Sequence, residues 1–203
     1  MKLIGMLDSP YVRRTVVSAH LMNLAIDHEA LSVFRDFEQF RSINPLVKAP
    51  TLVFDDGTLM VDSQLIVHYL EPLAAPSKRL TPTDPDLRGR NDRLTSIALA
   101  ACDKAVQLYY EVSLRPEPLR WPEWIERVST QLRAAFVMLE DSIGDTRWLC
   151  DDNRLCHADV TAAIAWRFAR HVVPDVIGGI DCPRLAALSE AAEALPAFQA
   201  ADF

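Results

Sequence analysis

The 203-residue chain lacks the features that would direct it to a membrane or to nucleic acid. Its 21 Lys and Arg are outnumbered by 28 Asp and Glu, and the formal charge of −7 provides no basic field to collect phosphates. No uncharged apolar run reaches the roughly 18 residues of a membrane span. The apolar run before Asp8 is too short for a signal peptide. These absences predict a cytoplasmic protein that acts on a small soluble ligand.

Cysteine is scarce, and none of it lies in the first half of the chain. The four cysteines, Cys102, Cys150, Cys156 and Cys182, show no C-x-x-C spacing. This pattern is typical of reduced thiols rather than of a disulfide framework. Cys150, Cys156 and His157 are conceivable zinc ligands, but a fourth ligand at usable spacing is missing. We therefore predict no metal site and interpret the cysteines as core or surface thiols.

The first third of the chain combines strand-like and helix-like patterns of apolar residues. Half of the residues are hydrophobic, which is enough to bury a core. Short apolar runs indicate strands, and apolar residues at a spacing near 3.6 indicate helices. The expected elements are a strand at 2–7, a helix at 12–24, a strand at 26–32, a helix at 34–41, strands at 51–54 and 58–61 that meet at an Asp-Gly turn, and a helix at 63–73. The predicted order is βαβαββα, an α/β domain.

A proline-rich stretch separates this domain from the rest. The sequence "EPLAAPSKRLTPTDPD" holds four prolines, which exclude a continuous helix and indicate a linker. All long segments beyond it have helical patterns, at 87–114, 122–143, 157–173 and 183–195. The predicted domains are residues 1–75, a linker at 76–86, and an all-helical domain at 87–203.

Ser9 and Pro10 stand between the first predicted strand and the first predicted helix. Ser is a favoured N-cap and Pro fits the first helical position, so a well-started helix is a sufficient explanation. A helix N-terminus also offers unpaired backbone N–H groups to an anion such as a thiolate. The Ser9 hydroxyl can donate a hydrogen bond to such a sulfur and lower the pKa of a ligand thiol from about 8.5. Ser9 is therefore a candidate catalytic residue.

Two further motifs offer groups for the ends of a ligand. Pro50 begins a strand as an ordinary turn proline or, if its peptide bond is cis, leaves the Ala49 backbone free to pair with a peptide-like ligand. Lys48 beside them suits a carboxylate. Asp62 and Ser63 open a helix, with Ser63 as the expected N-cap. They can also hold an amino-acid end, with Ser63 binding its carboxylate and Asp62 its ammonium. A single ligand that used all three motifs would have a carboxylate, a central thiol and an amino-acid end, and γ-Glu-Cys-Gly fits this description.

With these motifs the chain resembles the glutathione transferase family over essentially all its residues. The matching stretches are "SPYVRR", "NPLVKAPTLVFDDGTLMVDSQLIVHYLE", "HADVTAAIAW" and the closing "LPAF". The resemblance implies a thioredoxin-like N-terminal domain with a mixed four-stranded sheet, followed by an all-α helical bundle domain. It also implies glutathione as co-substrate without a metal, a substrate pocket in the helical domain, and a homodimer.

The resemblance also implies roles for single residues. Asp103 is a candidate for the acidic residue that reaches across the dimer in many members. Cys156 replaces the usual Ser or Thr cap, which predicts half of a capping box through Asp159. The roles carried over by position are Ser9 at the glutathione sulfur, Lys48 at the glycyl carboxylate, Ala49 as the backbone-pairing residue before a cis-Pro50, and Asp62 and Ser63 at the γ-glutamyl end.

Three functions remain open at this point. The first is a transferase in which Ser9 stabilises the glutathione thiolate for attack on an electrophilic apolar substrate. The second is a non-catalytic glutathione- or ligand-binding scaffold of the same fold. The third is a glutathione-dependent thiol-disulfide oxidoreductase, which the absence of cysteine before position 102 disfavours. Asp8 bears on the choice, because its carboxylate opposes a thiolate unless it points away or pairs with Arg13 or Arg14.

Aromatic residues of the helical domain are candidates for the second-substrate pocket, although aromatics at helical spacing are equally typical of a core. The candidates are Tyr109, Tyr110 and Trp166, with Trp121 as a further one.

Overall fold

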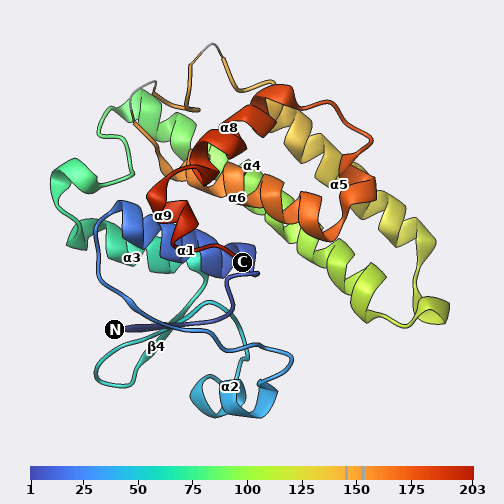
Figure 1. Cartoon of the computed structure of the whole chain (residues 1–203), viewed down its shortest axis with the longest axis horizontal. Coiled ribbons are helices and arrows are strands. Elements are labelled where there is room, and N and C mark those ends of the chain that lie inside the picture. Colours follow the sequence, from blue (N-terminus) through green and yellow to red (C-terminus); the bar gives the residue numbers. More distant parts are fainter. Residues whose placement is uncertain (145, 152–153) are drawn as a thin grey trace. The chain divides into compact units, whose positions relative to one another are not determined.

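The computed structural model describes residues 1–144, 146–151 and 154–203, and it divides into two compact units (Figure 1). The first unit comprises residues 1–81 together with 195–203, and the helical unit comprises residues 82–194. The division falls within the proline-rich stretch that the sequence marks as a linker. The last nine residues differ from the predicted domain layout, because they pack with the first unit.

The first unit is built on the predicted mixed four-stranded sheet, and the order of its strands is β2-β1-β3-β4. β2 runs parallel to β1, and β3 runs antiparallel to both β1 and β4. The predicted Asp-Gly turn joins β3 to β4, and Gly57 adopts the positive φ of 83° that glycine tolerates there. The strands are β1 (Lys2–Ile4), β2 (Asp27–Glu29), β3 (Thr51–Val53) and β4 (Leu59–Val61), each shorter than the apolar run that predicted it.

Helices cover this sheet on both faces (Figure 1). Phe40 of α2 packs against Ile4 of β1, and both are almost fully buried. α1 and α3 pack together on the other face. The helices of the first unit are α1 (Pro10–Leu21), α2 (Phe37–Ile43), α3 (Ser63–Leu70) and the short α9 (Pro196–Gln199), with 3-10 turns at Glu71–Leu73 and Pro76–Lys78.

The C-terminal segment is held on α1 by a buried arginine. Arg13 is fully buried, and its Nε donates to the carbonyl of Ala201 at 2.9 Å. Its Nη2 donates to the carbonyl of Phe198 at 3.4 Å. The guanidinium also lies over the rings of Phe198 and Phe203, in the geometry of a cation–π contact. These contacts explain why residues 195–203 belong to the first unit.

The helical unit has α6 at its centre. α6 packs against α4 and α8, and alanines at many of its buried positions allow this close approach. Cys156 is its N-cap, and both halves of the capping box are present, so the expectation of half a box was wrong: the cysteine sulfur replaces the usual oxygen as acceptor. The helices are α4 (Pro85–Tyr109), α5 (Pro122–Glu140), α6 (His157–Val172), α7 (Pro174–Ile177) and α8 (Pro183–Glu193), with a π-helical turn at Tyr110–Leu114 and a 3-10 turn at Glu117–Leu119.

We expect Gly5→Ala to destabilise the protein by at least about 2 kcal/mol. Gly5 follows β1 with φ of +145°, and an added Cβ would lie 2.6 Å from Cγ2 of Val12 and 3.0 Å from Cβ of Ala49. The matched control is Gly89→Ala, at an exposed helical position with open space around the new Cβ. The control should raise the free energy of unfolding by up to about 1 kcal/mol. Urea unfolding measures both, and equal stability of the two variants would contradict the packing argument.

Candidate functional site

Ser9 caps the N-terminus of α1, as the sequence predicted. It has an extended backbone conformation, and its Oγ accepts a long hydrogen bond of 3.5 Å from the N–H of Val12. Pro10 occupies the first helical position. The hydroxyl hydrogen of Ser9 remains free to be donated, because its cap interaction uses the oxygen as an acceptor. Ser9 thus stands where backbone N–H groups and the helix dipole favour an anion.

The loop before β3 brings Ala49 close to the end of β1. Gly5 lies between Val12 and Ala49, so only a hydrogen fits between α1 and this loop. The peptide bond from Ala49 to Pro50 is cis. Thr51 fixes the loop, because its hydroxyl donates to the carbonyl of Lys48 at 2.6 Å and accepts from the side-chain amide of Asn44 at 2.8 Å. Ala49 is therefore held near the start of α1.

Lys48 and Asp62 form a half-exposed ion pair at the start of α3. Lys48 Nζ lies 4.0 Å from Asp62 Oδ2. The other carboxylate oxygen, Oδ1, accepts from the N–H groups of Gln64 at 2.9 Å and Leu65 at 3.3 Å. Asp62 is therefore the N-cap of α3 and Ser63 its first helical residue, so the expectation that Ser63 is the cap was wrong. Asp62 is the cap because its carboxylate, and not the Ser63 hydroxyl, accepts the hydrogen bonds from the first N–H groups of the helix.

Both members of this pair stand beside unusual backbone. Asp62 has φ of 78°, and Val47, directly before Lys48, has φ of 46°. A β-branched residue such as valine rarely adopts a positive φ. Strained backbone of this kind concentrates at ligand sites, where the surrounding structure keeps a side chain or a peptide group in place.

Sequence reasoning missed Arg14, which ties α1 to α3. The Arg14 side chain is 1% exposed. Its Nη1 donates to Ser63 Oγ and its Nη2 to Gln64 Oε1, both at 3.1 Å. Arginine side chains are usually exposed, so the sequence "YVRR" predicts a surface position for Arg14 and gives no sign that it is buried. The guanidinium keeps the start of α3 in a fixed position relative to α1.

Asp8 is exposed, and no ion pair includes it among the residues that the structure describes. The sequence left open that it pairs with Arg13 or Arg14. The structure gives both guanidinium groups other partners, Ala201 and Phe198 for Arg13 and Ser63 with Gln64 for Arg14. Solvent therefore screens the Asp8 charge, which weakens its effect on a neighbouring anion.

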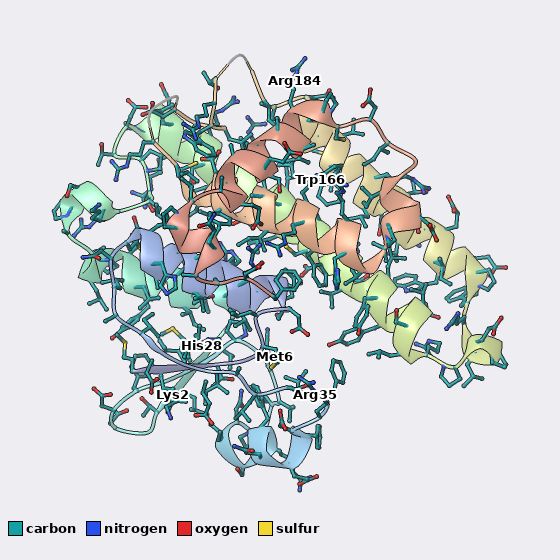
Figure 2. The ribbon with its side chains drawn as sticks, in the orientation of Figure 1. Lys2, Met6, His28, Arg35, Trp166 and Arg184 are labelled. Atoms are coloured by element: carbon teal, nitrogen blue, oxygen red, sulfur yellow. The ribbon has the colours of Figure 1, made fainter. Side chains whose placement is uncertain are left out.

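The aromatic candidates for a substrate pocket lie in different surroundings. Trp166, labelled in Figure 2, is buried on α6. Its ring packs edge to face on Phe136 at 5.1 Å and lines a cavity of about 380 Å³. The lining of that cavity includes neither Tyr109 nor Tyr110. These two pack edge to face at 6.2 Å, with Tyr110 46% exposed. Trp121 is also exposed.

The structure describes residues 1–144, 146–151 and 154–203, and two searches of these residues concern a metal site and a membrane span. Within them, no cluster of three or more His, Cys, Asp or Glu side chains is arranged to hold a metal ion. No helix in the same ranges is both long and apolar enough to cross a membrane. Asp103 lies exposed on α4, and its role across a dimer stays a prediction.

Comparison with known proteins agrees with this architecture. Residues 3–78 match the model of the glutathione S-transferase N-terminal domain. A glutathione S-transferase from Methylobacterium radiotolerans, solved with glutathione sulfonate, is 25% identical with a TM-score of 0.88, over 98% of this chain and 93% of that one. A glutathione transferase family member from Pseudomonas fluorescens, solved with S-(propanoic acid)-glutathione, is 27% identical with a TM-score of 0.81, over 99% and 98% of the two chains.

A curated relative has a specific enzymatic name. The maleylacetoacetate isomerase of Pseudomonas aeruginosa is 28% identical over 220 aligned residues, which cover 99% of this chain and 95% of the relative. The chain thus has the glutathione S-transferase fold, with a thioredoxin-like N-terminal domain and a largely helical second part. The first unit thus matches the glutathione S-transferase N-terminal domain family, and the whole chain is similar in fold to solved glutathione S-transferases.

The Arg14–Ser63 hydrogen bond should appear as an energetic coupling. We expect Ser63→Ala to lower the free energy of unfolding by about 1–3 kcal/mol, because it leaves a buried guanidinium without one acceptor. Arg14→Met and the double variant complete a cycle, and we expect a coupling energy of at least about 1 kcal/mol from urea unfolding.

The control for the serine change is Ser96→Ala, at an exposed position on α4, which should alter stability by less than about 0.5 kcal/mol. Additive effects of Ser63→Ala and Arg14→Met would show that the contact contributes no stability.

Proposed function

We propose that the protein binds glutathione in its first unit and activates the glutathione thiol for attack on an electrophilic carbon of an apolar substrate. The observation that carries the proposal is Ser9 at the N-cap of α1, in a domain whose fold is that of proteins solved with glutathione derivatives. Lys48, Ala49 and the start of α3 lie in the same unit. The protein as a whole is proposed to be a glutathione transferase.

Ser9 stabilises the sulfur anion in this proposal. Its hydroxyl donates to the thiolate, while the first turn of α1 adds the positive end of the helix dipole. Lowering the thiol pKa by one unit requires about 1.4 kcal/mol of preferential binding to the thiolate, which is within the range of one hydrogen bond to a charged group. Val12 stands one turn further on, so the site has no second sulfur for disulfide exchange.

The ends of glutathione are assigned to the charged and polar groups around this point. Lys48 binds the glycyl carboxylate, and the Ala49 backbone next to cis-Pro50 pairs with the cysteinyl peptide group. Asp62 binds the γ-glutamyl ammonium. Ser63 donates its hydroxyl hydrogen to the γ-glutamyl carboxylate, since its oxygen already accepts from Arg14. The buried Arg14 charge behind Ser63 strengthens this interaction.

A second candidate function is a glutathione-dependent isomerisation. The relatives named as maleylacetoacetate isomerases favour it. A thiolate that adds to an activated carbon–carbon double bond converts it to a single bond, which can rotate before the thiolate leaves. Both functions use the same thiolate, but the transferase consumes glutathione and the isomerase returns it. Product analysis with a cis-configured unsaturated keto acid and substoichiometric glutathione distinguishes the two.

Ser9 variants test the proposed mechanism. We expect Ser9→Ala to lower kcat/KM for conjugation of glutathione to chlorodinitrobenzene by about tenfold to a hundredfold, the value of one charged hydrogen bond. Ser9→Asp retains a favoured helix cap but adds a negative charge beside the sulfur, so it should be at least as inactive.

The matched control is Ser9→Thr, which retains both the hydroxyl and the cap and should preserve most of the activity. Undiminished turnover by Ser9→Ala or Ser9→Asp would remove Ser9 from the mechanism. Glutathione binding by the unaltered protein without turnover of any electrophile in a panel would instead support the non-catalytic scaffold.

Lys48 should contribute to glutathione affinity. We expect Lys48→Gln to raise the Kd for glutathione, measured by calorimetry, by about threefold to tenfold, a modest effect because the side chain is half exposed. The control is Lys78→Gln, which removes an exposed lysine elsewhere in the first unit and should leave the Kd unchanged. Equal affinities of the two variants would show that Lys48 makes no contact with the ligand.

A further inference from the structure

Two cysteines that the sequence analysis interpreted as core or surface thiols lie together in the helical unit. The sulfur atoms of Cys150 and Cys156 are 3.0 Å apart, and the Cys156 thiol has two acceptors within reach, Cys150 Sγ and, at 3.1 Å, Asp159 Oδ2. Both cysteines are reduced. A disulfide has an S–S bond of about 2.05 Å, so the two sulfurs need to approach by only about 1 Å.

A single buried carboxylate holds this arrangement. Asp159 on α6 is fully buried. Its Oδ1 accepts from the N–H of Leu149 at 2.7 Å, and its Oδ2 accepts from the N–H of Cys156 at 2.8 Å. Arg90 on α4 holds the same segment by donating to the carbonyl of Leu149 at 2.6 Å. The backbone on both sides of the sulfur pair is therefore fixed by side chains of the helical unit.

The two thiols differ in exposure and in acidity. Cys156 is 2% exposed, whereas Cys150 is partly exposed. The hydrogen bond from Cys156 lowers the pKa of Cys150, and the charge of Arg90 acts in the same direction, against burial and the charges of Asp159 and Asp151. The same hydrogen bond, together with burial, raises the pKa of Cys156. Cys150 is thus the accessible nucleophile and Cys156 the protonated partner behind it.

We propose that Cys150 and Cys156 form a redox-active thiol pair that a peroxide oxidises reversibly to a disulfide. The Cys150 thiolate attacks hydrogen peroxide: a sulfur–oxygen bond forms, the oxygen–oxygen bond breaks, and the hydroxide that leaves takes up a proton to become water. Cys156 Sγ then attacks Cys150 Sγ: the disulfide forms, the sulfur–oxygen bond breaks, and the Cys156 proton joins the leaving hydroxide as a second water. Two thiols lose two electrons in total, and the peroxide gains them.

The proposal is independent of glutathione binding, since all its residues lie in the helical unit. Its test uses the full-length reduced protein treated with one equivalent of hydrogen peroxide, then blocked by alkylation under denaturing conditions. Arg154 lies between the two cysteines, so trypsin separates residues 148–154 from residues 155–167. We expect these two peptides to be joined by a disulfide, in a protein that has lost two alkylatable thiols and regains them with dithiothreitol.

Three variants resolve the roles of the two sulfurs. Cys156→Ser keeps a favoured N-cap for α6, and in this variant Cys150 should stop at the sulfenic acid and be trapped by dimedone. Cys150→Ser should leave Cys156 reduced. The matched control is Cys182→Ser, which removes another cysteine at a helix N-cap and should form the linked peptides as the unaltered protein does.

Reaction rates give a second readout. Burial raises the pKa of Cys182 to about 11, so in the unaltered native protein Cys150 should be alkylated at least about tenfold faster than Cys182. Oxidation without the linked peptides, failure of any thiol to react with peroxide, or Cys182 reacting as fast as Cys150 would each overturn the proposal.

Discussion

The first unit depends on the buried guanidinium of Arg14. This group donates to Ser63 and Gln64 at the start of α3, from a position little more than one turn after the Ser9 cap of α1. Burying such a charge is costly unless its N–H donors have acceptors. If the two helices moved apart, the guanidinium would stay buried but lose its acceptors on α3. The positions of Ser9 and Asp62 relative to each other follow from this contact.

Several positive groups lie in the first unit, although the chain as a whole carries a formal charge of −7. The N-terminal ends of α1 and α3, the exposed ammonium of Lys48 and the buried Arg14 all lie in the first unit. In the proposed function these groups bind the two carboxylates and the thiolate of glutathione, and Asp62 binds its α-ammonium. Salt screens exposed charges beyond about 8–10 Å, so distant negative charges on the protein have little effect on these groups.

The sequence predicted most of the fold because its signals are local. Ser9-Pro10, Asp56-Gly57 and the proline-rich linker each determine backbone geometry within a few residues, and the structure has the features that they predicted. Contacts over long sequence distances were missed. Arg13 binds carbonyls 185 and 188 residues away, and nothing in its neighbours distinguishes it from a surface arginine. The start of α3 shows the limit of local signals, since Asp62 and Ser63 are both good caps and only the structure decides between them.

The sulfur chemistry of the chain is separated between its two units. The first unit contains no cysteine, since Cys102 is the first in the sequence and lies in the helical unit. With an oxidant, a cysteine in place of Ser9 could form a mixed disulfide with bound glutathione, whereas a serine cannot, so no protein disulfide forms at the proposed thiolate site. The Cys150–Cys156 pair is proposed to have the opposite property, because Asp159 fixes the backbone around two sulfurs that lie 3.0 Å apart. The proposed conjugation and the proposed thiol oxidation therefore depend on different residues.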